Sequence, residues 1–188
     1  MKYRIITPAT AYPCDLDFLK DQLRITHNAH DSILNSYIIA ATETAILETG
    51  RQLNYAALQG ISKYAGERYF IIERGPVKAV SKVEYLNLSG NLVEIISAQY
   101  DLQMDEYGAS IFLTDDFVLT NPNLSRPDAI RISFTAGWGK DLTDPFPELI
   151  RNAVAMKASR FYTNPDDGVD GKVTVSQNLL RSIACPIV

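Results

Sequence analysis

The spacing of apolar residues changes twice along this chain of 188 residues, from a helical period to a strand period near residue 64 and back near residue 145. Apolar residues recur about every 3.6 positions on a helix that buries one face, and every second position on a half-buried strand. Segregated blocks of helix and strand are typical of α+β folds. The sequence therefore predicts an α+β fold, in which an N-terminal antiparallel helix hairpin and a later helix form a small helical bundle with an inserted antiparallel β-meander.

The first helical block, residues 12–53, predicts the helix hairpin. In "CDLDFLKDQLRI" the residues Leu16, Leu19 and Leu23 have the spacing of one buried stripe. Asp15 precedes that stripe, where a carboxylate can accept hydrogen bonds from the free N–H groups of the first turn. We expect a first helix that begins after Asp15.

A longer second helix is predicted from "ILNSYIIAATETAILET". Its buried stripe is expected to comprise Ile33/Leu34, Tyr37/Ile38, Ala41 and Ala45, which recur about every 3.6 residues. The sequence offers Asn28 or Asp31 as the cap that begins this helix, and Gly50 as the residue that ends it.

The β-rich insert is expected over residues 64–136. Short runs of β-branched and aromatic residues alternate there with turns such as "NLSGN". In the run that begins at Val77, the side chains of Val80, Val83 and Tyr85 are expected to share a core face with Val77. Short strands separated by turns at this spacing predict antiparallel pairing rather than a βαβ fold.

The chain returns to a helical period at residues 145–163, which predict a third core helix. Pro147 suits its first turn, because the missing N–H of proline costs nothing there. The expected buried stripe is Leu149, Ala153, Met156 and Arg160/Phe161.

Residues 172–188 form a C-terminal tail that is either a short helix or an extended segment. Its apolar residues are Leu179, Leu180, Ile183, Ile187 and Val188. Packing on their own domain is one interpretation of these side chains.

Composition bounds the class of protein. The length suits a single domain over residues 1–188, and a formal charge of −4 argues against general nucleic-acid binding, which requires a clustered basic surface. Cys14 and Cys185 are too far apart in sequence to suggest a disulfide framework, so a reducing compartment is expected. The start of the chain has no apolar run typical of a signal peptide, and no stretch is long enough to span a bilayer. We expect a soluble protein.

The glycine corner Gly137-Trp138-Gly139 follows a predicted strand, as a phosphate-binding loop would. It has no third glycine in the pattern G-x-G-x-x-G and does not match G-x-x-x-x-G-K-[ST], and Asp141, Asp144 and Glu148 would repel phosphate. We predict a structural sheet-to-helix corner, made by Gly137, Trp138, Gly139 and Pro147.

Two other polar groups could suggest chemistry. His27, His30 and Asp31 form an H-x-x-H-D cluster, but zinc would need further ligands, so exposed capping residues are the favoured interpretation. The segment "PDDGVDGK" lacks the order of a calcium-binding EF-hand loop and is expected to be a mobile loop. From the sequence we predict no catalytic residue, no metal site and no cofactor.

Several segments, taken in order over about residues 13–186, resemble the head–tail connector proteins (adaptor or head-completion proteins) of long-tailed bacteriophages and prophages. They are similar to the family's opening helix, its long Ala-rich helix closing in Thr-Gly-Arg, its Val-rich strand with a glycine turn, its Thr-Ala-Gly-aromatic-Gly corner with the following helix, and its Leu-Leu tail. In this chain these segments are "DLDFLKDQLRIT", "DSILNSYIIAATETAILETGRQL", "RGPVKAVSKVEYLNLSGN", "AIRISFTAGWG" with "PELIRNAVAMKASRFYTN", and "NLLRSIACPIV".

The resemblance implies a structural protein without enzymatic activity, located in the neck of the virion and assembled in the host cytoplasm. Such subunits form a homo-oligomeric ring, typically dodecameric, below the portal protein. The ring extends the channel through which genomic DNA passes without sequence-specific binding, and it is the platform for a head-closure or tail-completion protein. Under this resemblance, the apolar tail residues become candidates for docking on the portal.

Two alternatives stay open at this point. The chain could be another head-closure or tail-completion protein of the same particle. It could also be a cytosolic α+β ligand-binding or enzymatic domain, for which His27, His30 and Asp31 are the only polar cluster the sequence offers.

Overall fold

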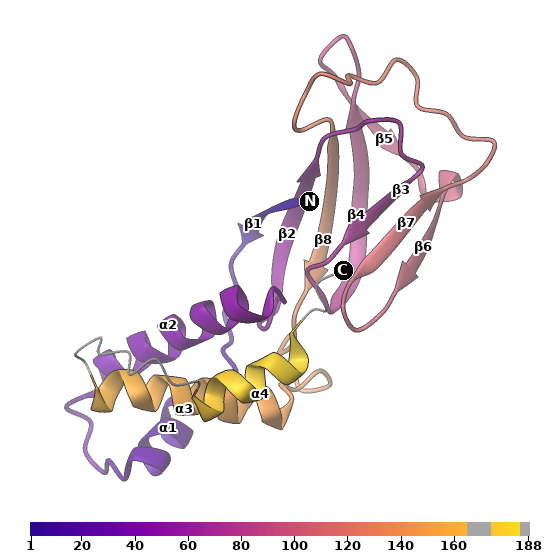
Figure 1. Cartoon of the computed structure of the whole chain (residues 1–188). Helices are drawn as coiled ribbons and strands as arrows, with labels where there is room; N and C mark the ends of the chain where they lie inside the picture. Colours follow the sequence, from indigo (N-terminus) through magenta and orange to yellow (C-terminus); the bar gives the residue numbers. More distant parts are fainter. Residues whose placement is uncertain (165–173, 185–188) are drawn as a thin grey trace. The chain divides into compact units, whose positions relative to one another are not determined.

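The computed structural model describes residues 1–164 and 174–184, and the chain divides into two compact units (Figure 1). Residues 1–9 and 55–137 make up the β unit, and residues 10–54 with those from 138 onward make up the helical unit. The strands are β1 (Lys2–Thr7), β2 (Ala56–Ser62), β3 (Tyr69–Ile72), β4 (Val77–Leu86), β5 (Leu92–Ile95), β6 (Tyr100–Met104), β7 (Ala109–Leu113) and β8 (Ile130–Ala136), with a short 3-10 turn over Ser97–Gln99. The helices are α1 (Leu16–Leu23), α2 (Asp31–Thr49), α3 (Glu148–Thr163) and α4 (Val175–Ile183). The α+β class expected from the sequence is confirmed.

The strands of the β unit form two sheets. One has the order β1-β2-β8-β4-β5 and the other β3-β7-β6, and every pairing among the named strands of the described residues is antiparallel. Antiparallel pairing was expected. The strand order differs from that of a simple meander, because β8 comes last in sequence yet pairs between β2 and β4 (Figure 1).

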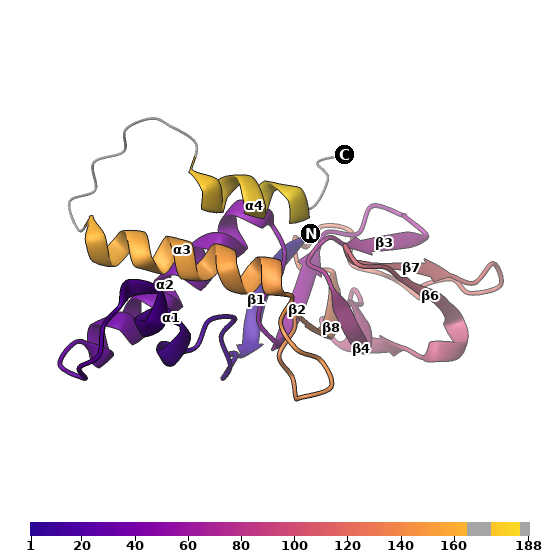
Figure 2. The ribbon, with the colours of Figure 1, turned by 90° about the horizontal axis from the view of Figure 1, so that it is seen from below.

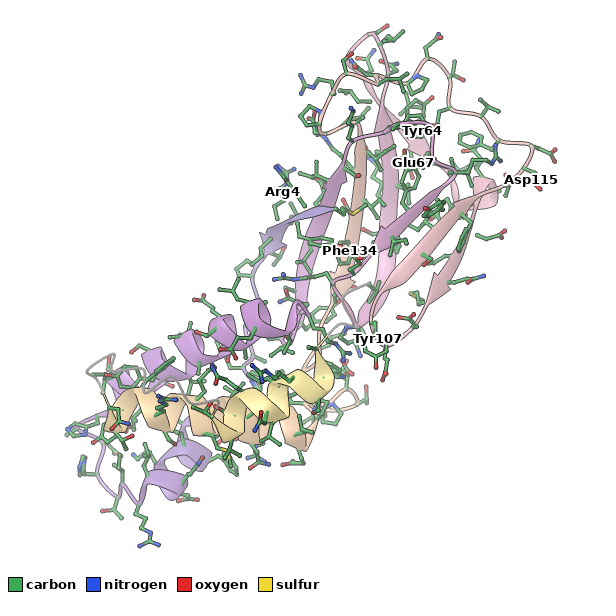
Figure 3. The ribbon with its side chains drawn as sticks, in the orientation of Figure 1. Arg4, Tyr64, Glu67, Tyr107, Asp115 and Phe134 are labelled. Atoms are coloured by element: carbon green, nitrogen blue, oxygen red, sulfur yellow. The ribbon has the colours of Figure 1, made fainter. Side chains whose placement is uncertain are left out.

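One hydrophobic core lies between the two sheets. On β8, the residues Ile130, Ile132, Phe134 and Ala136 are buried in strict alternation, as the period of two predicts. Phe134 meets the ring of Tyr3 edge-on, with 6.1 Å between the ring centroids, and Figure 3 shows it among the strands. The three-stranded sheet contributes Phe70, Ile72, Ala109, Ile111 and Leu113 to the same core.

Strands β1 and β2 were not predicted from the sequence. Strand β2 reads "AALQGIS", in which Ala, Gln and Gly have weak strand propensity. It is a strand because it pairs with β8 along its whole length, from Ala56 opposite Ala136 to Ser62 opposite Ile130. Tertiary pairing has overridden local propensity here.

In the helical unit, α3 packs against all three other helices, and Figure 2 shows it between α1 and α4. The expected hairpin of α1 and α2 is confirmed. The core of this unit combines leucines and isoleucines with small residues. The buried alanines of α2 and α3 are Ala41, Ala45, Ala153, Ala155 and Ala158.

Two of the helix ends agree with the residues predicted from the sequence, and one does not. The carboxylate of Asp15 accepts the N–H of Phe18 at the start of α1, and Gly50 ends α2 with a φ of 68°. The prediction of Asn28 or Asp31 as the cap of α2 is wrong, because His30 occupies that position without a side-chain cap bond. Both side chains instead accept hydrogen bonds from the ammonium of Lys20, which lies 2.7 Å from Asn28 Oδ1 and 2.9 Å from Asp31 Oδ1.

The predicted buried stripe of α3 is partly wrong. Ala153 is buried, but Leu149 and Met156 are 37% and 39% exposed. The buried face runs through Ile150, Val154, Lys157 and Ala158. A helix that contacts three neighbours buries a wide face, so the apolar period alone did not fix which residues lie at its centre.

Residues Val175 to Ile183 of the tail form helix α4. Thr174 begins it with a capping box, in which the Thr174 hydroxyl accepts the N–H of Gln177 and the side chain of Gln177 accepts the N–H of Thr174. Across residues 1–164 and 174–184, no helix is both long enough and apolar enough to cross a bilayer.

Candidate functional site

The corner between β8 and α3 is shaped by two glycines with positive φ, 99° at Gly137 and 79° at Gly139. The N–H of Gly139 donates to the carbonyl of Asp144 over 2.8 Å. A Cβ atom at Gly139 would lie 2.2 Å from the ring of Phe146, so no larger side chain fits without moving that ring. The backbone N–H groups of Gly137 and Trp138 also donate to carbonyls, so none of these three N–H groups is free to bind a phosphate.

Trp138 is held within the helical unit. The backbone N–H of Trp138 donates to the carbonyl of Leu53 over 3.3 Å, and the guanidinium of Arg51 lies 5.1 Å from the centre of the Trp138 ring. The same Arg51 donates through Nη1 to the carbonyl of Ile183 at the end of α4, over 3.0 Å. Arg51, a buried residue just after α2, therefore links the corner to the last turn of α4.

The entrance to α3 is negatively charged, as the sequence indicated. Pro147 occupies the cap position, and Glu148 lies in the first turn. Hydrogen bonds from the side chain and backbone N–H of Thr143 hold the pKa of the Asp141 carboxyl below its usual range. The ionised Asp141 carboxylate disfavours a phosphate ligand at this corner.

The cluster of His27, His30 and Asp31 lies at the turn between α1 and α2. The two imidazole rings are 4.8 Å apart, and Nδ1 of His30 lies 2.7 Å from the hydroxyl of Tyr162 on α3. Asp31 forms an ion pair with Lys20, so these three side chains bond to neighbouring elements rather than converge on a common point. Among the described residues, no group of three or more His, Cys, Asp or Glu side chains could hold a metal ion.

Cys14 is buried in the helical core. Burial, followed by the charge of Asp15, raises the pKa of its thiol to about 12, so the thiol is protonated at neutral pH. A nucleophilic cysteine requires the thiolate, and Cys14 is therefore a packing residue. The segment "PDDGVDGK" at residues 165–172 lies outside the described residues.

The tail residues proposed for docking are placed differently from one another. Leu180 is only 1% exposed and belongs to the helical core, while Leu179 and Ile183 are half-buried against it. With α4 packed in this way, Leu180 is not accessible to a partner, which favours packing on its own domain. Ile187 and Val188 lie outside the described residues, and their docking remains a prediction.

Sequence reasoning missed the two edges of the five-stranded sheet. β1 and β5 are its outermost strands, and each edge exposes two large aliphatic side chains. Ile5 and Ile6 are 57% and 54% exposed at the β1 edge, and Leu92 and Ile96 are 41% and 55% exposed at the β5 edge. Unpaired edges with exposed apolar side chains are surfaces on which another chain can assemble. The alternation in the sequence could identify β5 as a strand, but not as an edge.

Sequence comparison finds one protein family whose model matches part of the chain. Residues 14–100 match the model of the phage gp6-like head-tail connector protein family. Over these residues, the chain is similar to this family. The resemblance to head–tail connectors noted in the sequence is thereby confirmed, and head–tail connectors are structural proteins rather than enzymes.

Solved structures are similar in fold to the chain over its full length. A chain in the neck of an empty gene transfer agent (GTA) particle, computed with C6 symmetry, matches with a TM-score of 0.82 at 20% identity. A chain of the native GTA virion matches with a TM-score of 0.82 at 19% identity, and one from the native GTA neck computed with C12 symmetry with 0.78 at 20%. Each match covers 100% of this chain and 97% of the other, so the folds agree end to end. None of the curated proteins matches the chain in sequence.

Proposed function

We propose that this protein is a structural subunit of the neck of a tailed-phage-like particle, where copies of it form a ring that connects the head to the tail. One observation carries the proposal: the fold agrees over the whole chain with subunits of GTA particle necks, at a TM-score of 0.82. The family match over residues 14–100 independently supports a connector role.

The ring is proposed because two of the matched necks were computed with six-fold and twelve-fold symmetry. Copies related by rotation contact each other through two different patches, which a ring subunit must therefore carry. The exposed edges at β1 and β5 are different surfaces of the same sheet, and this is consistent with that requirement.

The partners follow from the same role. The ring would bind below the portal protein, extend the DNA channel and carry a head-closure or tail-completion protein on its other side. A subunit with a formal charge of −4 neutralises few phosphates, so genomic DNA could pass without being held.

The proposal is tested by mixing the purified protein with the portal ring encoded in the same genome and measuring masses by mass photometry. We expect a discrete complex with about one subunit of this protein per portal subunit, each adding 20.9 kDa. No complex at micromolar concentrations, with both proteins folded, would contradict the proposal.

A truncation then addresses the tail. Removing the residues after Ala184 deletes Ile187 and Val188 but leaves α4 and its buried Leu180 in place. If those last residues dock on the portal, the truncated protein loses the complex and keeps its thermal stability. Substitution of the fully exposed Leu142 by serine is the matched control and should leave portal binding unchanged.

The two other interpretations predict different results. A head-closure or tail-completion protein would bind the assembled connector or a tail protein rather than the portal alone. For a ligand-binding or enzymatic domain, the arrangement of His27, His30 and Asp31 offers no support, since each bonds to a neighbouring element.

A further inference from the structure

The two unpaired edges of the five-stranded sheet differ in charge. At one edge, β1 carries Lys2 and Arg4 and no carboxylate. Both side chains are exposed, and neither has an ion-pair partner among the described residues. Figure 3 shows Arg4 pointing away from the sheet, beyond its last strand. The β1 edge is therefore a basic edge with cations that nothing in its own unit neutralises.

At the opposite edge, two carboxylates face each other across the β4–β5 pair. Glu84 on β4 lies directly opposite Glu94 on β5, an arrangement in which like charges destabilise a sheet. One ammonium, that of Lys82, serves both, at 2.7 Å from Glu84 and 4.0 Å from Glu94. Glu94 is the outer of the two and is exposed, so the β5 edge has room for a second cation.

The register of the sheet places these charges on one level and one face. Reading across all five strands, each residue is paired with the next in the row Lys2, Ile61, Arg131, Glu84, Glu94. Arg131 in the middle of the row is already engaged by Asp128 at 2.9 Å. The row therefore begins with an unpaired cation at one edge and ends with an under-neutralised carboxylate at the other.

The exposed aliphatic side chains lie at the same two edges as the charges. Ile5 and Ile6 follow the cations along β1, while Leu92 on β5 and Ile96 just after it lie on either side of Glu94 in sequence. An edge that combines apolar side chains with one sign of charge fits a surface that combines apolar side chains with the opposite sign.

We propose that the β1 edge of one copy of this chain contacts the β5 edge of the next copy, with Lys2 and Arg4 meeting Glu94. The aliphatic side chains of the two edges bury one another beside these ion pairs. The contact joins two different patches, so it repeats from copy to copy in one direction and can close into a ring. This inference rests on the proposed ring function and identifies the surface that builds the ring.

The test uses two variants, each with one edge reversed in charge. Lys2→Glu/Arg4→Glu makes the β1 edge acidic, and Glu94→Lys makes the β5 edge basic. Each variant alone places like charges across every contact and should lower the fraction of protein in rings by about tenfold or more. An equimolar mixture should restore rings, because the two reversed edges are again complementary to each other, as are the two unchanged ones.

Matched controls carry the same changes of charge elsewhere. Arg24→Glu/Arg181→Glu and Glu43→Lys alter exposed side chains of the helical unit that form no ion pair among the described residues, and these variants should form rings as the unchanged protein does. Circular dichroism and the melting temperature establish that all variants are folded. Mass photometry, with and without the portal ring of the same genome, measures assembly.

The outcomes separate the inference from the function on which it rests. Loss of rings in each edge variant and recovery in the mixture supports the proposed contact. Rings in the unchanged protein together with normal rings in the edge variants, or no recovery in the mixture, overturns the contact and leaves the connector function standing. No oligomer of the unchanged protein, either alone or on the portal, overturns both.

Discussion

The two units differ in how much alanine their cores contain. At the centre of the β unit lie large side chains such as Phe70, Ile111 and Phe134, which fill the space between two sheets. In the helical unit, the packed helices α2 and α3 contribute five alanines to the core, Ala45 and Ala153 among them, and the distance between packed helices depends on the side chains at the contact. The β unit should therefore be most sensitive to lost volume, and the helical unit to added volume.

Charge is also used differently in the two units. The helical unit ties its helices together with ion pairs at the edge of its core, Lys157 with Glu48 and Lys20 with Asp31. The β unit places its charges on the outer face of the five-stranded sheet and leaves those of β1 unpaired. The helical unit therefore pairs these charges within itself, whereas the β unit leaves the charged side chains of β1 available for contacts with another chain.

The largest effect is expected from Phe134→Ala, which removes a ring that is 1% exposed from the core of the β unit. Lost transfer free energy and the resulting cavity should lower the free energy of unfolding by about 3–5 kcal/mol. Urea unfolding, followed by circular dichroism, measures this decrease in the free energy of unfolding. The control Phe112→Ala removes a ring from the outer face of the three-stranded sheet and should cost less than about 1.5 kcal/mol.

The same variant tests whether residues 1–188 unfold as a single domain, as predicted from the sequence. Trp138 is the only tryptophan and lies in the helical unit, so its fluorescence reports on that unit. If the whole chain unfolds cooperatively, Phe134→Ala shifts the fluorescence transition as much as the circular dichroism transition. A fluorescence transition that does not move would show that the two cores unfold separately.

Added volume is expected to disturb the helical unit next most strongly. Ala153 is fully buried on α3, and Ala153→Leu should cost about 1–3 kcal/mol by forcing the helices apart. Thermal unfolding followed by Trp138 fluorescence measures the loss. Met156→Leu, on the exposed side of the same helix, should change stability by no more than about 0.5 kcal/mol; a comparable loss in both variants would refute the contrast.

The ion pair between Lys157 and Glu48 should contribute less. Glu48→Ala leaves the buried Lys157 ammonium, 2.7 Å away in the intact pair, without its acceptor and should cost about 1–2 kcal/mol. The double variant Glu48→Leu/Lys157→Met replaces both charges by apolar groups and should recover much of that loss. Equal stability of the single and double variants in chemical denaturation would contradict this account.

The smallest effect is expected from Asp128 in the β unit. Hydrogen bonds from Arg126 and then Arg131 hold the pKa of the Asp128 carboxyl well below its usual range. A depressed pKa stabilises the folded state above the unfolded pKa of about 3.9, and this contribution is lost as the pH falls toward the folded pKa. Asp128→Asn should therefore cost under about 1 kcal/mol at pH 7, and its deficit should shrink progressively below about pH 4. A deficit independent of pH would contradict the assignment.

Local pattern predicted much of the fold. Strands β3 to β8 lie where alternating β-branched and aromatic residues placed them, and Asp15 and Gly50 bound helices as expected. Strand β2 was missed because "AALQGIS" becomes a strand only through pairing with β8, and the buried face of α3 was misplaced because three helices pack on it. In each case a contact distant in sequence decided the structure.

The candidate assembly surface could not be predicted for the same reason. Nothing in the sequence shows that Lys2 and Glu94 belong to the same row of residues, since that row exists only once five strands have paired. The glycine corner was easier to interpret, because its missing third glycine and its carboxylates are local features. Sequence reasoning could therefore argue against a phosphate site here, but it could not identify an assembly edge.

Cryo-electron microscopy of particles made from the genome that encodes this protein tests the central claim most directly. The account predicts a closed ring in the neck, between the portal and the tail, whose density fits this fold in every subunit and places the β1 edge of one copy against the β5 edge of the next. Particles with a fully resolved neck that contains no density for this fold would contradict the connector function.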